Sequence, residues 1–182
     1  MIENCQPVWF NGRVRTGKPD RRPATRAEAR ALAHPLRLRI LRLCLDIALT
    51  NRELADRLRE QPATVLYHVR TLVKTGFLAA EEERRGRRGA REIPYRATRK
   101  SWTLEFDPSG SGHVAPVDAF RAEMLEAGPA AVLQNVRLGV RLRPDALRRL
   151  QRRIEVAVMR AHADDDPDGE PVSLFVGLHR RR

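Results

Sequence analysis

Apolar residues recur every three or four positions in two segments before residue 45, which is the spacing of helices with one buried face. The first segment follows Thr25, and Glu28 three positions later completes a capping box. His34-Pro35 interrupts the pattern, and a proline suits the first turn of a second helix. The buried face of that helix is predicted to hold Leu36, Ile40, Leu41, Leu43 and Cys44.

Two further helices, joined by a short turn, are predicted between Thr50 and Gly76. Thr50 and Glu53 form a second capping box, Pro62 suits the first turn of the fourth helix, and Gly76 follows its end. The predicted apolar face of the fourth helix holds Val65, Leu66, Val69, Leu72 and Val73, and the opposite face holds Thr64, Tyr67, Arg70, Thr71 and Lys74. Two short helices of this kind are typical of a helix-turn-helix.

A hairpin is predicted directly after these helices. Residues 77–83 and 93–97 have the composition of strands, and glycines and arginines fill the loop between them. Helices followed by such a hairpin predict a winged helix-turn-helix, whose wing would carry Arg84, Arg85, Arg87, Arg88 and Arg91. Residues 101–106 suit one more strand before a stretch rich in Gly, Ser and Pro.

The last third of the chain returns to a helical pattern. One segment spans about 117–135 with an interruption at Gly128-Pro129, and another spans Pro144–Ala163. Residues 171–180 are predicted to form a terminal strand. We therefore expect a flexible arm over 1–23, a winged helix-turn-helix domain over 24–106 and a helical dimerisation or effector region over 107–182. The fold class is mainly α with a small β-hairpin wing, an α+β arrangement.

The basic excess lies in one part of the chain. The formal net charge is +12, and residues 21–100 carry 20 lysine and arginine residues against 9 acidic ones, whereas residues 101–182 carry 12 of each. A polyanion is the natural partner for such a segment, because each neutralised phosphate releases condensed counterions. A solvated, arginine-rich surface is the alternative interpretation. The two cysteines form no disulfide framework, and no apolar run is long enough to span a membrane.

Candidate DNA contacts occur in each part of the module. The recognition helix would place side chains against base edges or phosphates in the major groove, and the wing would follow the minor groove or the flanking phosphates. The candidates on the recognition helix are Gln61, Ala63, Thr64, Tyr67, His68, Arg70, Thr71 and Lys74. The candidates at the start of the preceding helix are Thr50, Asn51 and Arg52.

Three segments carry a family resemblance: ALAHPLRLRILRL, LTNRELADRL and TVLYHVRTLVKTGFL. Over about residues 27–97 the chain resembles the ArsR-type (arsenic-repressor-like) winged-helix regulators. The resemblance implies a homodimer that places two recognition helices in successive major grooves of a near-palindromic double-stranded operator. It also implies a transcriptional repressor of the bacterial cytosol, associated with the nucleoid and released by an effector.

The metal site of that family is not matched. Metal-sensing members carry a Leu-Cys-x-Cys-Asp-Leu pattern on the third helix, where residues 49–54 of this chain read Leu-Thr-Asn-Arg-Glu-Leu. Thr50 and Arg52 replace the thiolates, and an arginine repels a cation, so we expect no metal there. Cys44 is interpreted as a small buried residue. The chain is thus similar to a non-metal-sensing subgroup with a C-terminal extension, and no cofactor is expected.

The C-terminal region is expected to form the dimer. The helical stripe of Leu147, Leu150, Ile154 and Val158 is more typical of a dimer core than of a ligand pocket, although an unknown small-molecule effector is also considered. Residues 107–182 contain no cofactor loop, catalytic dyad or metal cluster, so an enzyme is not expected. The alternative functions are non-specific nucleic-acid binding and a protein-interaction winged helix, whose contact face would be more apolar.

Overall fold

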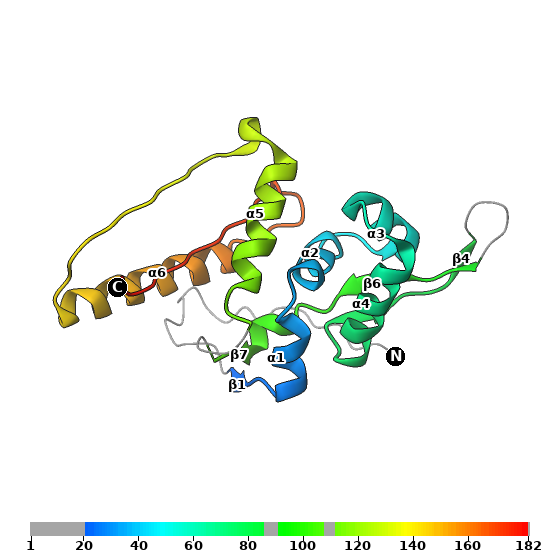
Figure 1. The fold of residues 1–182 in the computed structure, drawn as a ribbon, viewed down its shortest axis with the longest axis horizontal. Helices are drawn as coiled ribbons and strands as arrows, with labels where there is room; N and C mark the ends of the chain where they lie inside the picture. Colours follow the sequence, from blue (N-terminus) through cyan, green and yellow to red (C-terminus); the bar gives the residue numbers. More distant parts are fainter. Residues whose placement is uncertain (1–20, 86–90, 108–111, 182) are drawn as a thin grey trace.

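A computed structural model describes residues 21–85, 91–107 and 112–181 of the chain (Figure 1). Most of the predicted arm, together with Arg87 and Arg88 of the predicted wing, lies outside these residues. The helices are α1 (Arg26–Leu32), α2 (Pro35–Leu43), α3 (Asn51–Leu58), α4 (Pro62–Lys74), α5 (Ala115–Ala127) and α6 (Pro144–Ala163), with short 3-10 helices η2 (Lys100–Thr103) and η3 (Pro129–Ala131). The strands are β1 (Arg22–Pro23), β2 (Leu49–Thr50), β3 (Leu78–Ala80), β4 (Arg84–Arg85), β5 (Arg91–Glu92), β6 (Pro94–Ala97) and β7 (Leu104–Glu105).

Local signals determine where the first four helices begin and end. Both predicted capping boxes are present: the Thr25 hydroxyl accepts from the Glu28 amide at the start of α1, and Thr50 with Glu53 repeats this arrangement at α3. Each box satisfies two backbone donors that the first turn of a helix leaves without a partner. Gly76 follows α4 with φ +74°, a left-handed conformation that glycine adopts without steric cost.

Two ladders make up the predicted hairpin. Strands β3 and β6 pair antiparallel, with Leu78 opposite Ala97, and β2 adds to the other edge of β6 to give the order β2-β6-β3. Further out, β4 and β5 pair with Arg84 opposite Glu92. The strand predicted over 77–83 is therefore shortened to β3, and β4 lies in the predicted arginine loop. Figure 1 shows the outer ladder projecting away from the helices as a wing.

The core of this domain lies between α1–α4 and the sheet. Its largest fully buried side chains are Phe77, Ile40, Leu54, Leu72, Leu78, Leu104, Val65, Val69 and Cys44. Cys44 has no exposed surface, and burial raises the pKa of its thiol to about 12, so it is a neutral packing residue as predicted. The predicted apolar face of α4 is partly wrong, because Val73 is 37% exposed and Leu66 is only half-buried.

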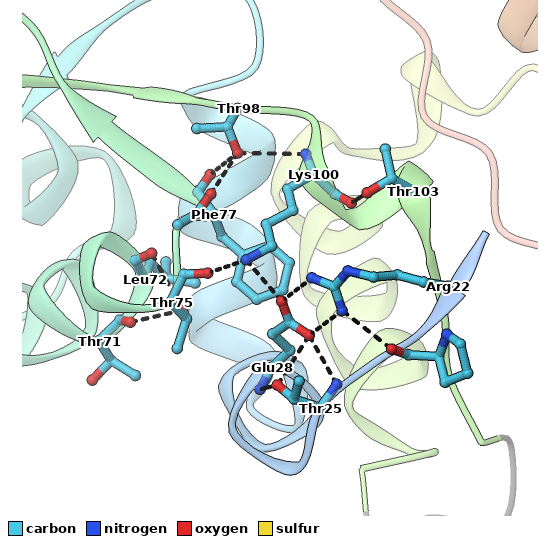
Figure 2. A network of polar contacts seen from close by, with 12 residues as sticks. Arg22, Thr25, Glu28, Thr71, Leu72, Thr75, Phe77, Thr98, Lys100 and Thr103 are labelled. Carbon is cyan, nitrogen blue, oxygen red and sulfur yellow. Dashed lines mark hydrogen bonds and ion pairs between the residues drawn. The ribbon is translucent and has the colours of Figure 1, made fainter. Parts of the chain in front are cut away.

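A parallel pair of short strands joins the two ends of the domain. Arg22 of β1, which was assigned to the arm, lies opposite Leu104 of β7. The predicted strand over 101–106 is shortened to β7, because η2 occupies its first half. Beside this pair the Glu28 carboxylate, 5% exposed, accepts from the Arg22 guanidinium at 2.6 and 2.9 Å and pairs with the Lys100 Nζ at 2.8 Å (Figure 2). These partners hold the pKa of Glu28 well below its usual range, so the carboxylate is charged and ties β1 to η2.

The C-terminal region consists of α5, which packs on α2, and the long helix α6. Gly128 ends α5 with φ 77°, at the predicted interruption. The helix predicted to continue to about 135 is wrong beyond this point, because only the 3-10 turn η3 follows. Helix α6 has the predicted bounds. Near the end of α6, His162 stacks on Trp102 of η2 with ring centroids 4.1 Å apart. Among the described residues of α6, none is buried.

The terminal strand predicted over 171–180 is wrong. These residues form no strand ladder with the described parts of the chain. A strand requires a neighbour with which to exchange backbone hydrogen bonds, and this segment instead contacts a helix: Phe175 lies against Phe120 of α5 at a centroid distance of 5.5 Å, and the Ser173 hydroxyl donates to Glu123.

Candidate nucleic-acid interface

Helices α3 and α4 are the two helices of the predicted helix-turn-helix, and a turn over 59–61 joins them. Arg59 ends α3 in the left-handed region, with φ 54°, and the Glu60 amide donates to the Ala55 carbonyl at 3.0 Å. The Asn51 side-chain amide donates to the Pro62 carbonyl at 3.0 Å, which ties the start of α3 to the start of α4. The angle between the two helices is thus held by the turn at the end of α3 and by the contact between the start of α3 and the start of α4.

The outer face of α4 is polar and exposed. Tyr67 is 65% exposed, and Gln61, Ala63, Thr64, Arg70 and Lys74 are exposed as well. Thr71 is half-buried, and its hydroxyl donates to the Tyr67 carbonyl at 3.0 Å. Because Val65, Val69 and Leu72 anchor the opposite face in the core, these groups are presented on a rigid helix.

His68 does not belong to this face, and its prediction as a DNA contact is wrong. Its ring is 6% exposed and lies 4.4 Å from the His34 ring, with Nδ1 3.4 Å from the Arg37 guanidinium. Position 68 lies three residues after Val65 and four before Leu72, so it falls on the buried stripe of the helix. Burial, and then the charges of His34 and Arg37, lower the pKa of His68 to about 4. The imidazole is therefore neutral at pH 7 and serves packing.

Arg37 is the buried partner of that histidine. It is not among the residues predicted for the buried face of α2, yet it is 8% exposed. Its Nε donates to the Ala31 carbonyl at 2.5 Å, and another guanidinium nitrogen donates to the Arg30 carbonyl at 2.7 Å. These carbonyls end α1, where cationic donors are favourable. No sequence signal distinguishes Arg37 from its exposed neighbours.

The three candidates at the start of α3 have different roles. Thr50 is 3% exposed and caps the helix, so its side chain cannot reach DNA and that prediction is wrong. Asn51 is half-buried and is engaged with Pro62, as described above. Arg52 is exposed. Of this set, Arg52 keeps the exposure that a phosphate contact requires.

The described arginines of the wing are exposed but differ in their pairing. Both oxygens of Glu53 accept from Arg84, at 2.6 and 2.7 Å, which fastens the base of the wing to α3. Arg91 pairs with Glu83 at 3.2 Å. Arg85 makes no ion pair with any residue in the described ranges. The base of the wing is therefore held in place, and its outer part carries the free charge.

A family comparison agrees with this geometry. A family model described as a helix-turn-helix domain matches residues 32–80, the stretch that runs from the end of α1 to β3. Residues 32–80 thus form a helix-turn-helix domain. No curated protein matches the chain. Among solved structures, reduced HlyU from Vibrio cholerae N16961 is 25% identical, with 42% of this chain and 75% of that chain covered and a TM-score of 0.36.

The helix-turn-helix domain supports a DNA-binding transcription regulator, because its second helix presents the polar face described above. In the described part of the chain, no group of three or more His, Cys, Asp or Glu side chains is placed to hold a metal ion. No described helix combines the length and hydropathy needed to cross a membrane.

Proposed function

We propose that the chain is a sequence-specific regulator of transcription that inserts α4 into the major groove of double-stranded DNA. The observation that carries this proposal is the exposed polar face of a helix whose other face is anchored in the core. Thr64 and Tyr67 lie one turn apart near its N-terminal half, and Arg70 follows one turn later. Side chains in these positions reach base edges, and an arginine can donate two bonds to guanine.

The wing supplies the second contact. Arg85 and Arg91 are exposed on a ladder that extends beyond the body of the domain. Arginines on such a projection suit the minor groove or the flanking phosphates, and they contribute affinity that depends on salt. This division assigns base reading to α4 and electrostatic attraction mainly to the wing.

A second copy of the chain is proposed to cover α6, so that a homodimer binds a near-palindromic operator as a repressor in the cytosol. Leu147, Leu150, Ile154 and Val158 lie along one side of α6 and all remain partly exposed in the single chain. Apolar stripes of this length are normally covered. Two copies related by a two-fold axis would present two recognition helices to successive major grooves.

An effector site is proposed between α2 and α5. A hollow of about 320 Å³ lies there, lined among others by Leu38, Leu41, Trp102, Phe120 and Phe175. Its volume and apolar lining suit a small, largely apolar molecule. Because α2 also packs against α4, a ligand in this hollow can alter the position of the recognition helix.

DNA recognition is tested with a sequence selected from a random duplex pool and a scrambled duplex, both measured by fluorescence anisotropy across a salt series. Tyr67→Ala and Arg70→Ala should each cost about 1–3 kcal/mol on the selected sequence and relax the preference for it. Arg121→Ala on α5 is the control, because it removes an exposed arginine far along the chain from α4. Equal affinity of the unmodified protein for both duplexes would instead support non-specific binding.

The dimer is tested by light scattering. Ile154→Glu places a charge in the stripe and should shift the mass toward a monomer, whereas Val156→Glu makes the same change two residues away on the other side of the helix. An Ile154→Glu variant with the mass of the unmodified dimer would refute this interface.

A further inference from the structure

A cluster of arginines on α6 takes no part in the functions proposed above. Arg149, Arg152, Arg153 and Arg160 line a hollow of about 390 Å³ together with Val156 and Ala157. Arg149 pairs with Asp145 at 2.6 Å, but both partners of that pair are exposed. The other three arginines have no ion pair with any residue that the structure describes. The surface formed by these four side chains is called the α6 arginine face.

The overall charge of the C-terminal region conceals this surface. Residues 101–182 are neutral in total, with 12 basic and 12 acidic residues. Within α6, however, five arginines (Arg148, Arg149, Arg152, Arg153 and Arg160) stand against the two acids Asp145 and Glu155. The positive charge is thus segregated onto one helix.

Helical geometry separates this face from the apolar stripe. At 3.6 residues per turn, Arg149, Arg152 and Arg160 lie on the side of the helix away from Ile154. Arg153 lies at the edge of this side, next to Leu150 of the stripe. A second copy that covers the stripe therefore leaves Arg149, Arg152 and Arg160 free. The face runs from Arg149 to Arg160, which is eleven steps along the helix or about 16 Å at 1.5 Å per residue. That length matches about five phosphates along one DNA strand.

We propose that the α6 arginine face is a second DNA-binding surface, which contacts the backbone phosphates of a DNA segment other than the one held by α4. This inference rests on the proposed DNA-binding function. The guanidinium group matches phosphate geometry with two parallel donors, and contacts to phosphates carry no sequence information. Figure 1 shows α6 at the opposite end of the molecule from α3, α4 and the wing. Because the two surfaces lie at opposite ends, the proposal assigns them to two separate DNA segments.

A membrane surface fits this geometry less well than DNA. An amphipathic helix on a membrane buries its apolar side among the acyl chains and keeps its basic residues near the headgroups. Here Arg149, Arg152 and Arg160 lie on the side away from the stripe, about a helix diameter from any surface that the stripe would enter. The stripe also contains only aliphatic residues and lacks the aromatic anchors of membrane interfaces.

The test is a two-duplex capture assay. The full-length protein is bound to an immobilised duplex of the selected sequence, about 20 base pairs long, and is then offered a fluorescent duplex of unrelated sequence across a salt series. Arg152→Gln with Arg153→Gln removes two phosphate contacts, which should lower the salt slope of the second capture by about 1.8. When the salt is raised from about 50 to about 200 mM, both proteins lose affinity for the second duplex. The loss in the variant should be about 12-fold smaller than the loss in the unmodified protein.

A matched control is Arg137→Gln with Arg141→Gln, which removes the same charge from exposed residues outside the hollow. An unchanged second capture in the Arg152/Arg153 variant, or an equal change in the control, would overturn the inference. The inference would also be overturned if the Arg152/Arg153 variant lost binding to vesicles that contain anionic lipid but kept the second-duplex capture. If the unmodified protein fails to bind the immobilised duplex, the proposed function itself fails, whereas normal first binding without dependence on Arg152 and Arg153 rejects only the second surface.

Discussion

Replacement of Arg37 by methionine tests how the helix-turn-helix domain is held together. The guanidinium is 8% exposed and connects three helices: it donates to the Ala31 and Arg30 carbonyls at the end of α1, and it lies 3.4 Å from His68 of α4. Arg37→Met keeps most of the apolar stem and removes the charge together with all of these donors. The Ala31 carbonyl then loses this partner, and the Arg30 carbonyl keeps the Ala33 amide at 3.3 Å.

The expected loss follows from these contacts. A hydrogen bond that involves a charged group contributes about 1.5–3 kcal/mol, so the two bonds to carbonyls together represent about 3–6 kcal/mol. Part of this is offset because the guanidinium no longer has to be buried, and the lowered pKa of Arg37 shows that burial disfavours its charged form. We therefore expect the free energy of unfolding to fall by about 2–4 kcal/mol. That is a large share of the stability of an ordinary domain.

Urea unfolding followed by far-UV circular dichroism measures this change. Arg42→Met is the control, because Arg42 lies five residues further along α2, is exposed, and its pair with Glu123 spans 3.9 Å. Pairs that are this exposed contribute about 0–1 kcal/mol. If Arg37→Met costs no more than Arg42→Met, the desolvation of the guanidinium cancels its hydrogen bonds and the reasoning fails.

Three further predictions concern the same domain. Thr50→Ala should lower the free energy of unfolding by about 0.5–2 kcal/mol through the lost cap, while DNA affinity at saturating folded protein stays the same; a selective loss of affinity would restore Thr50 as a contact. Arg59→Gly should raise the stability by about 0.5–1 kcal/mol in the same urea titration, because φ 54° is strained for arginine and free for glycine; a decrease would show that the Arg59 side chain contributes to packing. The folded protein keeps His68 neutral down to a pKa of about 4, whereas the unfolded chain takes up a proton near 6.5, so this contribution to stability is complete above pH 6.5 and is lost as the pH falls toward 4. A urea midpoint that does not change between pH 7 and 5, or that changes equally in His68→Asn, would contradict this assignment.

Local signals made the helices predictable. The capping boxes at Thr25 and Thr50 each involve residues three positions apart, and Pro144 with the apolar stripe defines α6. Such signals need no knowledge of the rest of the fold. The exposure of Tyr67 and Arg70 followed in the same way from the spacing of their apolar neighbours.

The features that were missed depend on residues distant in sequence. His68 is buried because Arg37, 31 positions earlier, supplies its polar partner. Strand β2 has two residues, too few to show an alternating pattern, and is recognisable only through its pairing with β6. The segment around Phe175 has the composition of a strand but finds a helix as its neighbour. In each case the missing information was the identity of the spatial partner.

The pairing of β1 with β7 places the entrance and the exit of the helix-turn-helix domain at one corner, fastened by Glu28. Figure 1 shows this corner away from the wing. Additional sequence attached at either boundary thus departs from the same point, remote from the projecting hairpin. Segments attached to the domain can consequently be exchanged or lengthened at that corner without a change in the wing. The same holds for fusions made in engineered reporters.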